Sequence, residues 1–129
     1  MSVTPRSPAT TARRAREQAG RTAEAVAALF LIAKGYRILG RRLRSRLGEI
    51  DIVAKRGRRL AFVEVKARSS LAAGHAALAD AQARRIHDAA ERFVAQRPHL
   101  QNCELGFDAV IVTPWRLPVH LPNALQPLY

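Results

Sequence analysis

The chain has 129 residues and carries 22 Lys and Arg residues against 10 Asp and Glu residues, a formal net charge of +12. This length leaves room for one domain, and 48% hydrophobic residues suffice for a core and argue against a disordered chain. The positive charge favours a polyanionic partner, with nucleic acid ahead of an anionic membrane surface. The single cysteine, Cys103, excludes an intramolecular disulfide and a cysteine-rich zinc site. No apolar run approaches the roughly 18 residues of a membrane span, so we expect a soluble, cytoplasmic protein without membrane association.

The N-terminal part of the chain predicts a basic arm and then a helix. Residues 1–16 are rich in Ser, Thr and Arg and contain no acid, and we expect residues 1–12 to form a disordered arm. Apolar residues recur at helical spacing from about Thr11 to Lys34, where Gly35 ends the pattern. Glu24 lies one step round the helix from this apolar stripe.

Strand patterns follow. The first strand runs from Gly35 through a basic stretch to a turn near Gly48. Two further strands, Glu49–Ala54 and Leu60–Lys66, flank Gly57 and predict a hairpin.

The C-terminal half predicts one helix and one strand. After a loop at residues 69–74, a helix is expected over about Ala76–Gln96, followed by a nearly apolar strand at Leu105–Val112 that should be covered on both faces. From Pro114 onward, three more prolines indicate an irregular tail, residues 114–129. The order helix, three strands, helix, strand predicts an α/β fold in which helices flank one mixed sheet, as a single domain over residues 13–113.

The predicted hairpin brings two carboxylates together. A type II′ turn needs Gly at its first central position, so Gly57 and Arg58 form the expected turn. Counting back from it pairs Arg56 with Arg59, Val53 with Phe62, Asp51 with Glu64, and Glu49 with Lys66. Strand alternation places Ile50, Ile52 and Ala54 together on the other face. Asp51 and Glu64 would then have Cβ atoms about 5 Å apart, which costs stability unless a cation lies between them.

The oxygen ligands of Asp51 and Glu64 favour Mg²⁺, Mn²⁺ or Ca²⁺ over zinc. Lys66 shares the face of Glu64, where its ammonium could orient a water or stabilise charge on a phosphoryl oxygen. Cross-strand Glu and Lys pairs commonly have no function on a solvated face. Here the acids lie within strongly apolar strands, which favours a site.

The segments GEIDIVA at 48–54 and FVEVKAR at 62–68 resemble the YraN-like family of small bacterial proteins, whose pattern is GEIDLIA and then FVEVKxR. That family is assigned to the PD-(D/E)xK restriction-endonuclease-like superfamily. Further matching positions are Gly20-Arg21, Glu24, Gly35-Tyr36, Gln82, Arg85-Ile86, Phe107 to Val110 and His120 to Ala124.

The resemblance implies an α-β-β-β-α-β core and a Mg²⁺ or Mn²⁺ cofactor. It makes Asp51 and Glu64 the motif carboxylates, Lys66 the motif lysine and Glu24 an accessory acid on the metal. The chain departs from the family at Ala81, where a basic residue is common, and at Gly106, where Arg is common. It also reads Arg41-Arg42-Leu43 where the family often has Arg-Asn and an aromatic residue.

Residues outside the hairpin leave alternatives open. Gln82 lies on the buried stripe of the second helix, so its amide either points to the site or sits at the edge of the core. Asp108, the charge inside the last strand, is interpreted as a buried partner of an arginine, with a further site acid as the alternative. The four histidines lack the spacing of a metal cluster, and Cys103 has no activating neighbour.

A basic surface beside the carboxylates is predicted to follow a phosphate backbone. Its candidate residues are Arg41, Arg42, Arg44, Arg46, Arg68 and Arg85. Runs of this kind are often only a solvated face. Phosphate contacts would make binding fall steeply with salt and show little sequence preference.

The sequence therefore predicts a metal-dependent nuclease that hydrolyses phosphodiester bonds in DNA, branched or single-stranded, rather than in RNA. The alternative is a non-catalytic nucleic-acid-binding module with the same fold, and a basic ribosome-associated or scaffold protein is a third interpretation. The oligomeric state stays open and is compatible with a homodimer.

Overall fold

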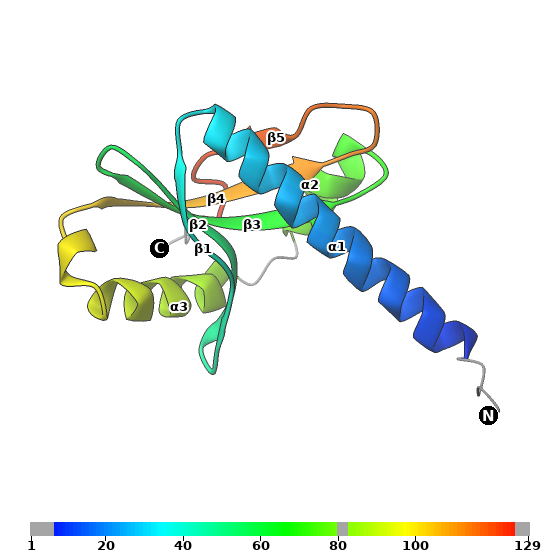
Figure 1. Cartoon of the computed structure of the whole chain (residues 1–129), viewed down its shortest axis with the longest axis horizontal. Coiled ribbons are helices and arrows are strands. Elements are labelled where there is room, and N and C mark those ends of the chain that lie inside the picture. The colour runs from blue at the N-terminus through cyan, green and yellow to red at the C-terminus, as the bar shows by residue number, and fades with distance from the viewer. Residues whose placement is uncertain (1–6, 80–82, 126–129) are drawn as a thin grey trace, which may run out of the picture.

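A five-stranded sheet in the order β1-β2-β3-β4-β5 forms the centre of the fold (Figure 1). The structure is a computed structural model and describes residues 7–79 and 83–125. Its elements are α1 (Pro8–Ala33), β1 (Arg37–Ser45), β2 (Gly48–Arg56), β3 (Arg59–Ala67), α2 (Leu71–Ala79), α3 (Ala83–Ala95), the 3-10 helix η1 (Pro98–Leu100), β4 (Glu104–Val112) and β5 (Val119–Leu121). Strands β3 and β4 are parallel and the other neighbours are antiparallel. The predicted mixed α/β architecture is confirmed.

Helix α1 begins earlier than the predicted Thr11. The Ser7 side chain accepts a hydrogen bond from a backbone N–H in the first turn and Pro8 occupies the first helical position, two features that favour a helix start. Residues 8–12, expected in the disordered arm, are therefore helical. The helix ends at Ala33, one residue before the predicted Lys34, and Gly35 follows it with a φ of 95° that suits glycine.

Helices cover both faces of the sheet (Figure 1). Helix α1 packs on one face through a buried cluster that joins its Ala27 and Leu31 to Ile52 and Val63. On the other face α3 packs through Phe93 against a second cluster. Helix α2 lies on the α3 side of the sheet, where Gly74 contacts the buried Ile111 of β4. In the described part of the chain, no helix combines the length and the apolar character needed to cross a membrane.

Two sequence-based expectations in the C-terminal half are wrong. The single helix predicted over Ala76–Gln96 is divided into α2 and α3, and α2 begins at Leu71, inside the predicted loop. The tail predicted as irregular contains β5, which pairs antiparallel with β4. Because β5 has only three residues and lies between Pro118 and Pro122, its sequence carries no recognisable strand pattern.

The hairpin register between β2 and β3 is as predicted, from Arg56 opposite Arg59 to Ile52 opposite Val63. Gly57 has a φ of 60°, as the first central position of a type II′ turn requires. The predicted alternation along β2 is wrong at one residue, because Ile50 packs in the α3 cluster and not on the α1 face with Ile52.

Candidate functional site

Asp51 lies where the pairing of β2 with β3 ends and where one position of its pairing with β1 is skipped. The register with β1 skips the position that would pair Asp51 with Arg42, and Arg42 has a φ of 53°. The register with β3, followed from the turn, ends at Ile52 and Val63, so the predicted pairing of Asp51 opposite Glu64 is not part of it. A positive φ at a residue other than glycine is uncommon, and such residues are enriched at functional sites, although Trp115 and Asn123 of this chain also have one. This interruption of the strand pairing breaks the side-chain alternation at Ile50 and leaves space beside Asp51.

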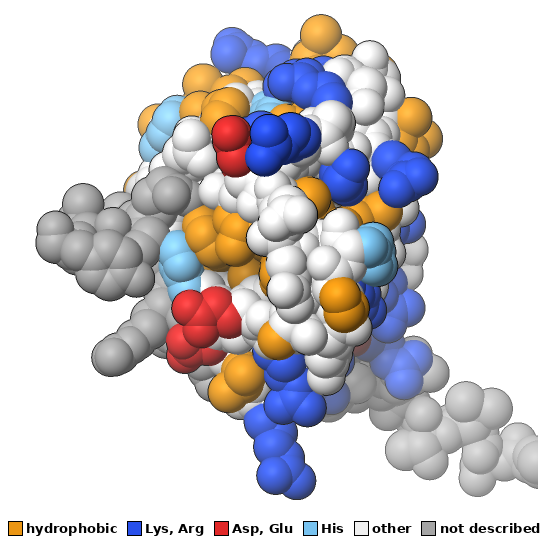
Figure 2. Space-filling model, turned by 90° about the vertical axis from the view of Figure 1, so that its left-hand side faces the viewer, with side chains coloured by type: hydrophobic (Ala, Val, Ile, Leu, Met, Phe, Trp, Pro, Cys, Tyr) orange, Lys and Arg blue, Asp and Glu red, His pale blue; other side chains and the backbone are white. Residues whose placement is uncertain are grey.

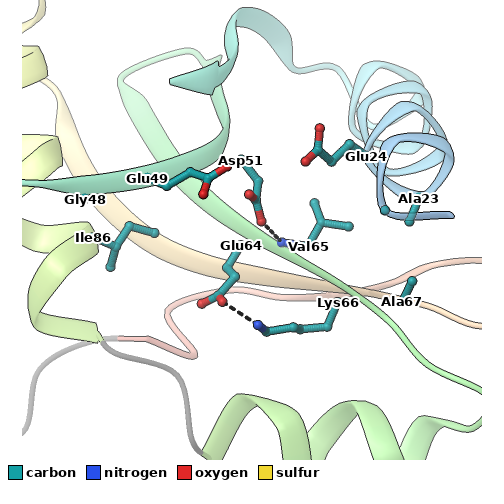
Figure 3. Close-up of a pocket in the computed structure, with 11 residues that line it drawn as sticks. Ala23, Glu24, Gly48, Glu49, Asp51, Glu64, Val65, Lys66, Ala67 and Ile86 are labelled. Atoms are coloured by element: carbon teal, nitrogen blue, oxygen red, sulfur yellow. Dashed lines mark hydrogen bonds and ion pairs between the residues drawn. The ribbon is translucent and has the colours of Figure 1, made fainter. Parts of the chain in front are cut away.

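A pocket of about 350 Å³ occupies this space (Figure 3). Four carboxylates from three elements line it: Glu24 of α1, Glu49 and Asp51 of β2, and Glu64 of β3. Lys66 lines the same pocket. The structure thus brings together four residues predicted as site residues, Glu24, Asp51, Glu64 and Lys66. It adds Glu49, which strand alternation had placed on the face of Asp51 without assigning it a role.

Three of the four carboxylates have a cationic partner. Glu24 accepts from Arg42 Nε at 2.5 Å, Glu49 lies 3.3 Å from Arg44 Nε, and Glu64 lies 2.8 Å from Lys66 Nζ. Glu49 and Lys66 were predicted to lie opposite each other. Instead, Glu49 pairs with Arg44, and Lys66 pairs with Glu64.

Asp51 differs from the other three acids, because its described partner is a neutral backbone group. Asp51 Oδ2 accepts a hydrogen bond from Val65 N at 2.8 Å (Figure 3). That contact replaces the next backbone pairing of the hairpin and fixes the carboxylate against β3.

The pKa of Asp51 is raised to about 6, mainly because burial disfavours the charged form. The hydrogen bond from Val65 acts in the opposite direction, and the negative charges of Glu24, Glu64 and Glu49 each raise the pKa further. A carboxylate perturbed by burial and by like charges in a pocket is typical of functional sites. Its chemistry would favour a bound cation.

Asp51 and Glu64 are the residues that could hold such a cation. Within the described ranges, no group of three or more His, Cys, Asp and Glu side chains converges closely enough to hold a metal ion. Mg²⁺ is commonly held by one or two carboxylates, with water and substrate phosphates completing its shell, so two carboxylates fit it. Glu24, predicted as a further ligand, lines the pocket but is paired with Arg42.

The predicted phosphate-binding arginines lie in different places. Arg41, Arg44 and Arg46 are exposed on β1 and the turn after it, whereas Arg42 is half-buried against Glu24. Arg68 is exposed directly after β3. Gln82 and the side chain of Arg85 lie outside the described residues.

Asp108 is fully buried and belongs to a structural network. Its two oxygens accept hydrogen bonds from the Arg59 guanidinium at 2.6 and 2.7 Å, and His120 Nε2 lies 2.8 Å from Oδ2. Although burial acts to raise it, these hydrogen bonds and one from Asn123 N hold the pKa of Asp108 well below its ordinary range. The interpretation of Asp108 as a buried partner of an arginine is confirmed. The role of His120 was missed, because it depends on the unpredicted strand β5.

Comparison with known proteins finds close relatives of the chain. The model of a family described as "Uncharacterised protein family UPF0102" matches residues 23–112. A UPF0102 protein of Paramagnetospirillum magneticum is 46% identical over 121 residues, which cover 91% of this chain and 94% of the relative. One of Rhodopseudomonas palustris strain BisB5 is 50% identical over 122 residues, covering 95% and 93%. One of Rhizobium meliloti is 49% identical over 105 residues, covering 81% and 86%.

Proposed function

The chain belongs to the uncharacterised family UPF0102, the YraN family that its motifs resemble, and we propose that it is a metal-dependent nuclease acting on DNA. The observation that carries the proposal is the pocket in which Asp51 and Glu64, from neighbouring strands, lie together with Lys66. The net charge of +12 supports a phosphate-bearing substrate.

In this proposal Asp51 and Glu64 hold Mg²⁺ or Mn²⁺. Such an ion, when bound, polarises a phosphodiester and lowers the pKa of a bound water. The hydrogen bond from Val65 N fixes the orientation of Asp51. Lys66, which lies 2.8 Å from Glu64, supplies a positive charge that can orient the attacking water or stabilise a phosphoryl oxygen. Glu24, which lines the α1 side of the pocket and is paired with Arg42, would act as an accessory acid near such an ion.

The test is a cleavage panel of branched, nicked and single-stranded DNA with Mg²⁺ or Mn²⁺. We expect Asp51→Ala and Glu64→Ala to abolish cleavage while DNA binding is kept, and Lys66→Ala to reduce cleavage strongly. Asp88→Ala, which removes an exposed acid of α3, is the matched control and should cleave like the wild type. Calorimetry should detect a Mg²⁺ or Mn²⁺ site that both carboxylate variants lose.

Three outcomes would contradict the proposal. The first is a wild type that binds no divalent cation with or without DNA, and the second is cleavage that survives Asp51→Ala. The third is DNA binding with no cleavage of any substrate in the panel, which would favour the non-catalytic nucleic-acid-binding module.

A further inference from the structure

A second hollow, of about 360 Å³, runs between β1 and α3. We name it the arginine groove, because Arg42 and Arg44 of β1 line one wall, and Arg92 of α3 and Arg97, two residues after the end of that helix, line the other. None of the described residues that line it is acidic. Arg92 and Arg97 carry no strand or motif signal in the sequence, and only the packing of α3 beside β1 brings them to the other two arginines.

The arginine groove adjoins the carboxylate pocket along two elements. On β2, Ile50 lines the groove, while Glu49 and Asp51 on either side of it line the pocket. On α3, Ile86 lines the pocket and Ala89 lines the groove, about one helical turn or roughly 5 Å further along. A nucleic-acid strand bound in the groove would therefore lie next to the carboxylate pocket.

The arginines differ in how strongly the protein already holds them. Arg92 is exposed and has no ion pair within the described part of the chain, and the pair between Arg44 and Glu49 is exposed and therefore weak. Arg97 is fixed, because its guanidinium lies 3.7 Å from the centre of the Phe93 ring and donates to the Phe93 carbonyl at 3.1 Å. The groove thus combines preorganised and free cations, a combination that suits binding of a polyanion.

We propose that the arginine groove binds the sugar–phosphate backbone of one nucleic-acid strand and leads it to the carboxylate pocket, an inference that rests on the proposed function. The ligand contact is to phosphate and not to bases. Base stacking needs an exposed aromatic ring, and the aromatic residue of the groove, Phe93, is buried and covered by Arg97. Binding should therefore be insensitive to base identity and even to the presence of bases.

The experiment measures fluorescence anisotropy of labelled strands in EDTA, so that no metal and no cleavage contribute. The probes are a single-stranded oligothymidylate and an abasic strand of the same length. Arg92→Ala is compared with Arg116→Ala, which removes the same charge from an exposed residue of the β4–β5 loop. We expect Arg92→Ala to weaken binding of both strands about threefold to tenfold at moderate salt, and Arg116→Ala to change it little. Thermal unfolding checks that both variants are folded.

Equal effects of Arg92→Ala and Arg116→Ala would overturn the proposal, since binding would then follow net charge alone. An abasic strand that binds far more weakly than the oligothymidylate would also overturn it, because the contact would be to bases. Tighter binding to phosphatidylserine vesicles than to either strand, lost in Arg92→Ala, would assign the groove to a membrane surface instead. The two proposals fail separately. A wild type that binds both strands through Arg92 but cleaves no substrate of the panel with Mg²⁺ or Mn²⁺ would overturn the nuclease proposal and keep the groove, whereas cleavage with equal effects of Arg92→Ala and Arg116→Ala would overturn only the groove.

Discussion

Asp51 combines a half-buried carboxylate with three acidic neighbours, and this combination costs folding stability when the carboxylate is charged. Its pKa is raised from 3.8 to about 6, so the folded state binds this proton more tightly than the unfolded state does. The destabilisation is complete well above pH 6, falls as the pH passes through about 6, and disappears toward the ordinary pKa of Asp.

Asp51→Asn should therefore stabilise the protein in EDTA. Asparagine keeps an acceptor for the N–H of Val65 and removes the charge. We expect the free energy of unfolding to rise by about 1–3 kcal/mol at about pH 8, and the gain to shrink as the pH falls through about 6. Urea titrations at several pH values measure it, with the exposed acid Glu17→Gln as control. If the variant were less stable than the wild type at high pH, the charged carboxylate of Asp51 would stabilise the fold, which contradicts this prediction.

Asp108 is a buried acid of the opposite kind, because its lowered pKa means that the charged form stabilises the fold. This contribution is present above the ordinary pKa of Asp and is lost as the pH falls through the lowered value. Asp108→Asn leaves the Arg59 guanidinium without its anion and should cost about 2–4 kcal/mol of unfolding free energy near neutral pH. Asp88→Asn, at an exposed position, should cost almost nothing. Similar losses in the two variants, measured by urea unfolding, would contradict this role.

Two departures from the family pattern have local structural explanations. Arg42 stands where the family often has Asn, and its φ of 53° is a conformation that Asn tolerates better than Arg. The Arg42 side chain is paired with Glu24. Gly106 stands where the family commonly has Arg, and a Cβ there would overlap the guanidinium of Arg59, which already occupies the space beside Asp108.

At the scale of the element, two helical glycines should respond in opposite ways to the same substitution. A Cβ added to Gly74 of α2 would overlap the buried side chain of Ile111, so Gly74→Ala should cost about 1–3 kcal/mol. A Cβ added to Gly20 of α1 meets nothing within 4 Å, so Gly20→Ala should stabilise by about 0.5–1 kcal/mol through helix propensity. Urea unfolding of the two variants measures both signs. Gly20 lines the carboxylate pocket. A Gly20→Ala variant less stable than the wild type would contradict the prediction that helix propensity alone decides the effect at this position.

The elements that sequence predicted well are those whose signals are local. The β2–β3 hairpin follows from turn chemistry at Gly57, and its register follows by counting from that turn. The interruption at Asp51 could not be predicted, because it depends on the backbone of Arg42 in another strand. The three-residue strand β5 was missed for a related reason: tertiary pairing with β4, and not its own pattern, makes it a strand.

In the candidate site, too, the features with local sequence signals were predicted and those that depend on tertiary contacts were not. The motif residues Asp51, Glu64 and Lys66 were predicted from their place on two strands, and the structure places them in one pocket. Their partners were not predicted, because the pairing of Glu49 with Arg44 and of Glu24 with Arg42 depends on how three elements meet. The arginine groove was likewise invisible, since helical periodicity does not show which strand Arg92 will face.

At the scale of the whole molecule, positive charge dominates the surface, while Asp108 is buried and Asp51 is half-buried. Figure 2 shows Lys and Arg side chains spread over one face of the molecule, with Asp and Glu side chains gathered at only two places on it. A net charge of +12 on 129 residues repels itself, and this repulsion is screened by salt. Salt should therefore act on folding and on ligand binding in opposite directions.

We expect added salt to raise the thermal unfolding midpoint of the free protein and to weaken its binding to single-stranded DNA in EDTA. Three phosphate contacts, from Arg44, Arg92 and Arg97, predict a slope of about −2 in a plot of log K against log salt concentration, since Arg42 is already paired with Glu24. Arg92→Ala should reduce the steepness by about 0.7, whereas Arg116→Ala should leave it nearly unchanged. Because the protein becomes more stable over the same range of salt, unfolding cannot account for the loss of binding. A flat plot, or a midpoint that falls with salt, would show that the positive charge is not organised around a phosphate backbone.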